Sequence, residues 1–144
     1  MKVLEELLNY RKNVGTIFLL EKEKEELEEN RIIVSGPSYD VTGIRPKGYV
    51  TSNLDKNIIK HEAQIAKIDK KIKKIKRTLA IIDSLILSLG EEQRRIIVGF
   101  YLEGKKNQKI AEEIDANLSV EAIKKRKKRI VKKMQKQYDD SIKK

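Results

Sequence analysis

The chain has 144 residues, no cysteine, one histidine and a formal net charge of +11, and 38% of its residues are charged. This length suits one domain, or a small domain with an extended helical part. Without cysteine the chain has neither a disulfide framework nor a thiolate metal site, and one histidine cannot form a histidine-based metal site alone. We therefore expect no metal and no cofactor. No apolar run approaches the ~20 residues of a membrane-spanning helix, and the first residues do not read as a signal peptide, which predicts a cytoplasmic protein.

The positive charge is concentrated in the later part of the chain. Residues 1–53 carry 8 basic and 9 acidic side chains, whereas residues 54–144 carry 25 basic and 13 acidic ones. A polyanionic partner should therefore bind the C-terminal part. The low aromatic content of 5% and the high charged content suit long, partly exposed helices.

Residues 1–30 are predicted to form one helix. Five apolar residues repeat at alternating steps of four and three, namely Val3, Leu7, Tyr10, Val14 and Ile17. The acidic run over residues 21–29 continues the helix and is read as a solvated face, with a partner-binding acidic patch as the alternative. Glycine and proline then predict a loop over residues 31–53.

Residues 54–89 carry a seven-residue repeat that is typical of a coiled coil. The two series of the repeat are Ile58, Ile65, Ile72, Leu79 and Ile86, and Ile68, Ile75, Ile82 and Leu89, with His61 in the remaining place. This stripe needs a partner: the first helix folded back as an antiparallel hairpin, the same helix of a second subunit, or both. We expect a homo-oligomer through this helix.

A simple hairpin about the predicted loop would place the acidic run 21–29 opposite residues 55–63. The acidic run would then not face the basic cluster over residues 67–77, which holds seven Lys or Arg residues and one Asp. That cluster is either a solvated flank or a second phosphate-binding surface.

Residues 89–138 are predicted to form a compact unit of three helices, followed by a frayed tail over residues 139–144. Glu91 opens the first helix, Gly104 ends it as a C′ glycine, and Ser119 is placed to cap the third helix. The expected core residues are Ile96, Ile97, Phe100, Tyr101, Ile110, Ala111, Ile114, Ile123, Ile130 and Met134. The whole chain is thus expected to be all-α, with a helical hairpin or coiled coil over residues 1–88 and a helix-turn-helix unit after it.

The third predicted helix, over residues 119–136, combines an apolar edge with an unusually basic surface. Nine Lys or Arg residues lie between Lys124 and Lys136, too many to be neutralised locally. A helix held by its apolar edge that offers its N-terminal end and a basic face is typical of the second helix of a helix-turn-helix on DNA.

The segment Leu89–Gly104 resembles the opening of the region-4 domain of bacterial sigma factors, with an arginine-rich first turn and a Tyr-Leu-Glu-Gly ending. Lys109–Ile114 resembles the Glu-Ile-Ala-Glu-Glu-Leu element of that family, and the likeness resumes over Ser119–Met134. The turn from Ile114 to Ser119 takes five steps where the family usually takes three. The helical N-terminal half and the stretch over residues 37–43 are also similar to the RinA/ArpU-type regulators, phage and prophage proteins that control late or packaging genes in Gram-positive bacteria.

These resemblances imply a sequence-specific DNA-binding transcription regulator of phage or prophage origin, with double-stranded DNA as its partner. The third helix would enter the major groove, where Glu121 can accept a hydrogen bond from cytosine N4 and Lys125 can donate to guanine O6 and N7. The predicted DNA-binding residues are Lys109, Ser119, Val120, Glu121, Ala122, Lys124, Lys125, Arg126, Lys128, Arg129 and Lys132.

Two alternatives stay open at this point. The basic coiled coil could bind nucleic acid, or an acidic protein, without sequence preference. The region-4-like unit could instead serve as an adaptor that binds RNA polymerase, because region-4 domains contact both DNA and polymerase. An enzyme is not expected, since the acidic run 21–29 has no neighbouring His or Cys and the chain lacks a phosphate loop, a nucleophile elbow and metal-ligand spacing.

Overall fold

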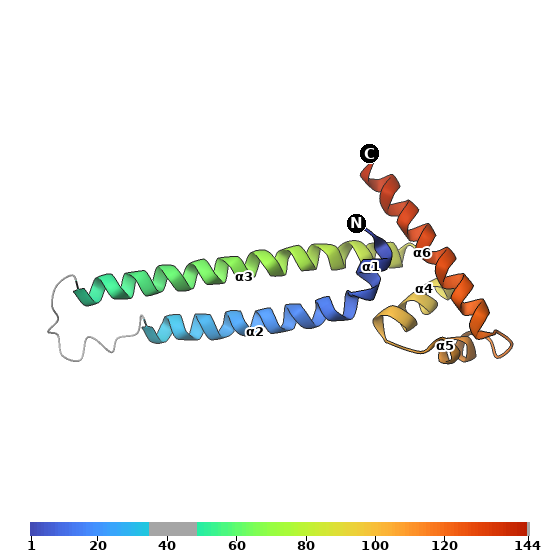
Figure 1. Ribbon diagram of the computed structural model, residues 1–144, viewed down its shortest axis with the longest axis horizontal. Coiled ribbons are helices and arrows are strands. Elements are labelled where there is room, and N and C mark those ends of the chain that lie inside the picture. The colour runs from blue at the N-terminus through green and yellow to red at the C-terminus, as the bar shows by residue number, and fades with distance from the viewer. Residues whose placement is uncertain (35–48, 144) are drawn as a thin grey trace. The chain divides into compact units, whose positions relative to one another are not determined.

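The computed structural model describes residues 1–34 and 49–143, with side-chain surroundings for residues 1–30 and 56–143. Those residues form helices and no strand (Figure 1), which confirms the all-α prediction. The helices are α1 (Val3–Leu8), α2 (Tyr10–Val34), α3 (Tyr49–Leu87), α4 (Glu91–Ile97), the π-helix η2 (Val98–Leu102), α5 (Asn107–Ile114) and α6 (Val120–Ile142). They form two compact units: a terminal unit, Met1–Val14 with Lys76–Lys144, and a hairpin unit, Gly15–Ile75.

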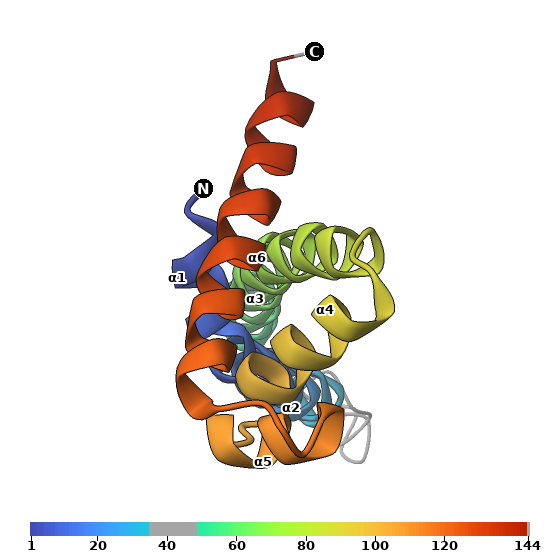
Figure 2. The same ribbon diagram turned by 90° about the vertical axis from the view of Figure 1, so that its right-hand side faces the viewer.

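The prediction of one helix over residues 1–30 is wrong, because α1 ends at Leu8 and α2 begins at Tyr10. Asn9 lies between them with φ −92° and ψ 0°, in the bridge region outside the regular helix. Val3 and Leu7 are completely buried, whereas Val14 is 48% exposed. The packing of α1 against α6 and η2 (Figure 2) therefore overrides the continuous apolar pattern of the sequence.

Hydrogen bonds fasten the N-terminus to the rest of the terminal unit. The side-chain amide of Gln135 accepts from the Val3 N–H (2.8 Å) and donates to the Met1 carbonyl oxygen (3.1 Å). The Tyr10 hydroxyl donates to Asp83 Oδ1 at 2.7 Å. Burial, together with Asp83, raises the pKa of Tyr10 to about 12, so the phenol keeps its proton, and hence this bond, across the physiological range.

The core of the terminal unit draws on both ends of the chain. Its buried members are Val3, Leu7, Ile82, Ile86, Leu89, Ile96, Ile97, Ile110, Ala111, Ile123, Ile130 and Met134. Phe100, Tyr101 and Ile114, which were expected in this core, are half-buried and pack against it. The division at residue 76 therefore differs from the predicted boundary between residues 88 and 89, because the last turns of α3 bury Ile82 and Ile86 here rather than in the hairpin.

The hairpin unit pairs α2 and α3 as antiparallel neighbours within one chain (Figure 1). Lys24 Nζ lies 2.8 Å from Asp69 Oδ1, and Leu20 and Leu27 line a groove together with Ile68. The acidic run is thus opposite residues 64–71 and not 55–63, since apolar packing rather than the midpoint of the loop sets the register. Ile68 and Ile72 are 6% and 7% exposed, so these two positions of the heptad stripe are covered inside the chain, while Ile58, Ile65 and Ile75 are half-buried.

Three predicted boundaries change. Helix α2 continues to Val34 and α3 begins at Tyr49, so helix covers both ends of the predicted loop 31–53, and its centre, residues 35–48, lies outside the described residues. The tail predicted to fray at residue 139 is helical to Ile142. Gln135 Nε2 donates to Asp139 Oδ1 at 3.0 Å one turn later, which supports this extension of α6.

Gly104 ends the helical segment formed by α4 and η2, as predicted. It has φ +73°, the left-handed conformation that favours glycine, and a Cβ atom there would overlap the Arg11 guanidinium. The preceding π-helix closes with bonds from the Glu103 N–H to the Val98 oxygen (2.9 Å) and from the Lys105 N–H to the Gly99 oxygen (2.8 Å). The chain thereby turns from η2 toward α5.

Replacing Gly104 with alanine is expected to lower the free energy of unfolding by roughly 1–2 kcal/mol, because alanine is strained at positive φ. Gly15→Ala is the matched control, since Gly15 lies within α2 at an ordinary φ and a Cβ atom there meets nothing within 4 Å. Chemical denaturation of both variants measures the difference. Equal stabilities would contradict a conformational role for Gly104.

Candidate nucleic-acid interface

The helix α6 is fixed in the terminal unit by its N-cap and by one apolar face. The Ser119 side chain accepts a hydrogen bond from the Ala122 N–H at 3.1 Å, which confirms the predicted cap. Ile123, Ile130 and Met134 are at most 3% exposed and lie in the core. The opposite face of α6 consequently points to solvent along its first four turns.

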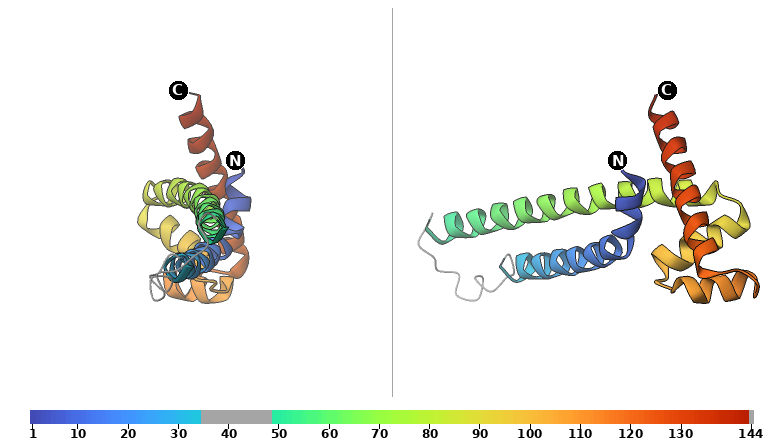
Figure 3. Two further views of the ribbon diagram at one scale, coloured as in Figure 1. Left: turned by 90° about the vertical axis from the view of Figure 1, so that its left-hand side faces the viewer. Right: turned by 45° about the vertical axis from the view of Figure 1, so that its right-hand side comes forward.

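A tight turn joins α5 to α6 (Figure 3, right). Asp115 Oδ1 accepts from the Asn117 N–H at 3.0 Å, and the Asp115 carbonyl oxygen accepts from the Leu118 N–H at 3.0 Å. The side-chain bond is an Asx-turn, which gives the five steps between Ile114 and Ser119 a defined conformation. Ile110 and Ala111 of α5 are buried where the two helices pack together.

The structure exposes most of the predicted DNA-binding residues. Val120, Ala122 and Arg126 are half-buried, and the other predicted residues are exposed: Lys109, Ser119, Glu121, Lys124, Lys125, Lys128, Arg129 and Lys132. All of these except Lys109 come from α6 or its cap. They lie on two sides of the helix: Glu121, Lys124, Lys125, Lys128 and Lys132 line one groove, and Arg126 and Arg129 line another beside α4.

Two of the basic side chains already have acidic neighbours. Arg126 forms a hydrogen-bonded ion pair with Glu92 of α4, and Lys124 Nζ lies 3.5 Å from Glu121 Oε1. Among the described residues, the remaining predicted cations form no ion pair: Lys109, Lys125, Lys128, Arg129 and Lys132. Their charge is therefore available to an anionic partner.

Lys127 differs from its basic neighbours because it lies on the core side of α6 and is only 9% exposed. Its Nζ stands 3.1 Å from the centroid of the Phe100 ring, which meets the Tyr101 ring edge to face. Burial, and then the charge of Lys124, lower the pKa of Lys127, whereas the ring face favours the charged form. Lys127 thus joins α6 to η2 and is not free to contact DNA.

Replacing Lys127 with methionine, which has a similar shape and no charge, is expected to raise the free energy of unfolding at pH 7 by roughly 1 kcal/mol. The gain should shrink as the pH rises toward 10.5, the ordinary pKa of lysine. In that range the unfolded wild-type chain binds more protons than the folded one, so the stability of the wild type increases with pH. Denaturation at pH 7 and pH 10 measures both effects. The opposite result, a methionine variant that is less stable than the wild type at pH 7, would contradict this prediction. It would show that the contact between the Lys127 ammonium and the Phe100 ring stabilises the fold by more than the loss of ammonium hydration costs.

A groove of about 830 Å³ runs along one side of α6 within the terminal unit. Its lining residues are Leu4, Tyr101, Asn107, Glu121, Lys124, Lys125, Lys127, Lys128, Val131 and Lys132. Five of these are lysines and one is acidic, so the groove is strongly positive. Asn107 Oδ1 is buried here with no hydrogen-bond partner among the described residues.

Sequence reasoning missed Leu4, Tyr101 and Asn107 as neighbours of the predicted site. Asn107 had a detectable signal, because it opens α5 and the first N–H groups of a helix bind anions. Tyr101 was predicted only as a core residue. Leu4 had no local signal, since it reaches the groove through the packing of α1 from the other end of the chain.

The short helix α5 and the longer helix α6 are joined by a tight turn, and α6 is capped and basic. This arrangement is that of a helix-turn-helix unit. Residues 79–134 match the family described as "Sigma-70, region 4". The match begins ten residues before the predicted resemblance, in the last turns of α3, which supply Ile82 and Ile86 to the same core. This finding supports a DNA-binding, transcription-related role for the segment.

No curated protein and no solved structure matches the chain. The similarity to RinA/ArpU-type regulators therefore stays a prediction. Within the described part of the chain, none of the helices combines the length and the apolar character that crossing a membrane requires.

Proposed function

We propose that this protein is a sequence-specific DNA-binding transcription regulator whose helix α6 enters the major groove. The observation that carries the proposal is the two-sided character of α6. Its core side is fixed by Ile123, Ile130 and the buried Lys127, while its outward side carries cations that form no ion pair in the described residues. A rigid helix with a solvent-facing basic side has the form that major-groove recognition requires.

The first turns of α6 are proposed to read the bases. Glu121 would accept from cytosine N4, and Lys125 would donate to guanine O6 and N7. Val120 and Ala122 would make apolar contacts, and Lys124 would add a further donor. The ion pair between Lys124 and Glu121 is long and exposed, so it would open at little cost when either residue meets a base edge.

The remaining cations are proposed to hold phosphates. Lys128, Arg129 and Lys132 follow the base-reading residues along α6, and Lys109 lies on the supporting helix α5. Arg126 would have to exchange Glu92 for a phosphate, so we expect it to contribute less than its exposed neighbours. If six phosphates are neutralised, log K should fall against log salt with a slope of about −5.

The test is selection of bound duplexes from a randomised pool at about 150 mM salt, which suppresses purely ionic binding. We expect a sharp consensus sequence. A featureless pool would contradict base reading and favour a non-specific nucleic-acid-binding protein. Capture of RNA polymerase without DNA, together with a featureless pool, would favour the adaptor role. A phage or prophage origin and a cytoplasmic location are further predictions that this selection does not address.

A further inference from the structure

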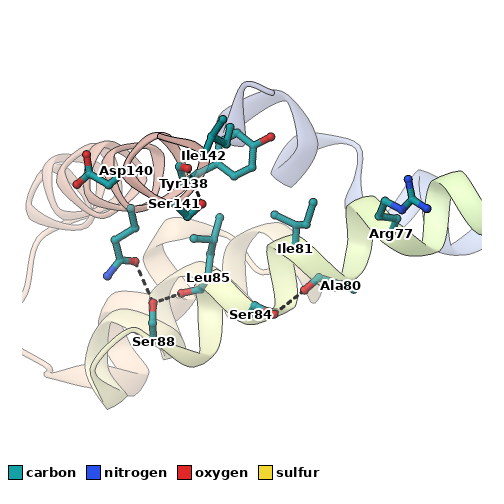
Figure 4. A pocket seen from close by; sticks show the side chains of 11 residues that line it. Arg77, Ala80, Ile81, Ser84, Leu85, Ser88, Tyr138, Asp140, Ser141 and Ile142 are labelled. Carbon is teal, nitrogen blue, oxygen red and sulfur yellow. Dashed lines mark hydrogen bonds between the residues drawn. The ribbon is translucent and has the colours of Figure 1, made fainter. Parts of the chain in front are cut away.

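A second groove lies in the terminal unit, between the last turns of α3 and the last turns of α6 (Figure 4). It measures about 820 Å³, and its lining residues are Arg77, Ala80, Ile81, Ser84, Leu85, Ser88, Gln137, Tyr138, Asp140, Ser141 and Ile142. Ile142 is 60% exposed although it is apolar. This groove contains none of the residues proposed to bind DNA.

Polar contacts join the two helices at one end of the groove. Ser88 Oγ lies 2.7 Å from the Leu85 carbonyl oxygen and 2.9 Å from Gln137 Oε1, so it joins α3 to α6 (Figure 4). Ile81, Leu85 and Tyr138 line the middle. An apolar surface that is fixed in this way needs no rearrangement to accept another apolar surface.

Opposite charges stand at the two ends of the groove. Arg77 lies at the α3 end and Asp140 lies on α6 at the other end, with the apolar side chains between them (Figure 4). Neither residue forms an ion pair among the described residues. A two-fold axis through the middle of the groove exchanges its ends, so Arg77 of one copy would face Asp140 of another.

Part of the expected oligomer seam is buried in the folded chain. Ile68 and Ile72 of the heptad stripe are buried in the hairpin unit, and Ile82 and Ile86 are buried in the core of the terminal unit. A second copy could reach these four residues only if those contacts opened. Other members of the stripe, Ile58, Ile65, Ile75 and Leu79, are half-buried, so the heptad helix offers no continuous exposed apolar seam.

We propose that the groove between α3 and α6 is a self-complementary interface at which two copies of this chain associate around a two-fold axis. Its apolar centre meets the same apolar centre of the second copy, and its ends form two Arg77–Asp140 pairs between the copies. An isologous contact of this kind requires one surface that complements itself, and the arrangement of charge here meets that condition.

Sedimentation of charge-reversed variants tests the pairing. Arg77→Asp alone and Asp140→Arg alone should each weaken self-association by roughly tenfold or more, because each homodimer then holds two like-charge pairs. A mixture of the two variants should recover the association of the wild type, since both pairs are restored in the mixed dimer. Both substitutions are at exposed positions, and circular dichroism confirms that the variants fold.

The apolar centre has its own matched pair of variants. Ile142→Ser should weaken association, whereas Leu87→Ser should not, because Leu87 is 69% exposed but does not line the groove. A wild-type chain that sediments as a monomer at every accessible concentration would overturn the proposal. So would a dimer that is insensitive to Ile142→Ser and shows no recovery on mixing the charge-reversed variants.

Discussion

Leu7→Ala is expected to lower the free energy of unfolding by about 3 kcal/mol and the melting temperature by more than about 10 °C. Leu7 is completely buried in the core that also contains Ile123 and Met134 of α6. Removing most of its side chain leaves a cavity beneath the helix proposed to read DNA. The effect should appear in the melting of the helix-turn-helix unit, although Leu7 lies more than 70 residues before it in the chain.

Leu8→Ala is the matched control for this experiment. Leu8 follows Leu7 on the same helix and is 63% exposed, so its substitution should change stability by no more than about 0.5 kcal/mol. Thermal and chemical denaturation of the two variants compare the same chemical change at a buried and an exposed site. Equally small effects would contradict the packing of α1 into the terminal unit.

A triple variant, Lys125→Ala with Lys128→Ala and Lys132→Ala, is expected to bind DNA roughly 100-fold more weakly at moderate salt. These three side chains are exposed and form no ion pair among the described residues, so their loss should not disturb the fold. Lys128 and Lys132 are proposed to hold phosphates, so the loss of each should make the slope of log K against log salt less steep by about 1, for a total change of about 2. Lys125 is proposed to contact a base, so its loss should alter the preferred sequence instead. A slope change near about 3 with an unchanged preferred sequence would contradict the base-reading role of Lys125.

The hairpin unit supplies a control with the same change in net charge. Lys67, Lys70 and Lys73 lie on α3 within the basic cluster, and all three are exposed. If DNA binds α6, replacing these three lysines with alanine should leave the specific affinity within about threefold of wild type. Equal losses in the two triple variants would instead indicate that binding depends on total charge, or that the cluster on α3 is a second phosphate-binding surface.

Features determined by neighbouring residues were predictable from the sequence. The heptad stripe correctly identified the buried face of α3, because a repeat of seven follows directly from helical geometry. Ser119 and Gly104 were correctly assigned as helix ends, since capping depends on side-chain and backbone chemistry within one turn. Ile123, Ile130 and Met134 were correctly placed in the core, because their helical spacing puts them on one face of α6.

Features set by contacts between distant segments were not predictable. The break at Asn9 follows from the burial of Leu7 against α6, and a single sequence gives no sign of that contact. Helical spacing places Lys127 on the same face as Ile123 and Ile130, so its burial had a signal in the sequence. Its contact with the Phe100 ring had none, because that contact depends on how α6 packs against η2. The register of the hairpin was also predicted wrongly. The prediction assumed that the loop lies midway between the paired residues, whereas the packing of Leu20 and Leu27 against Ile68 of α3 sets the register.

The most direct test of the central claim, that the first turns of α6 read bases, is to run two selections from the same randomised duplex pool at about 150 mM salt. One uses the wild type, and the other uses Lys124→Ala combined with Lys125→Ala. We predict a sharp consensus for the wild type and a changed or weakened preference at one or two base pairs for the variant. The same consensus from both proteins would contradict base reading by these residues of α6.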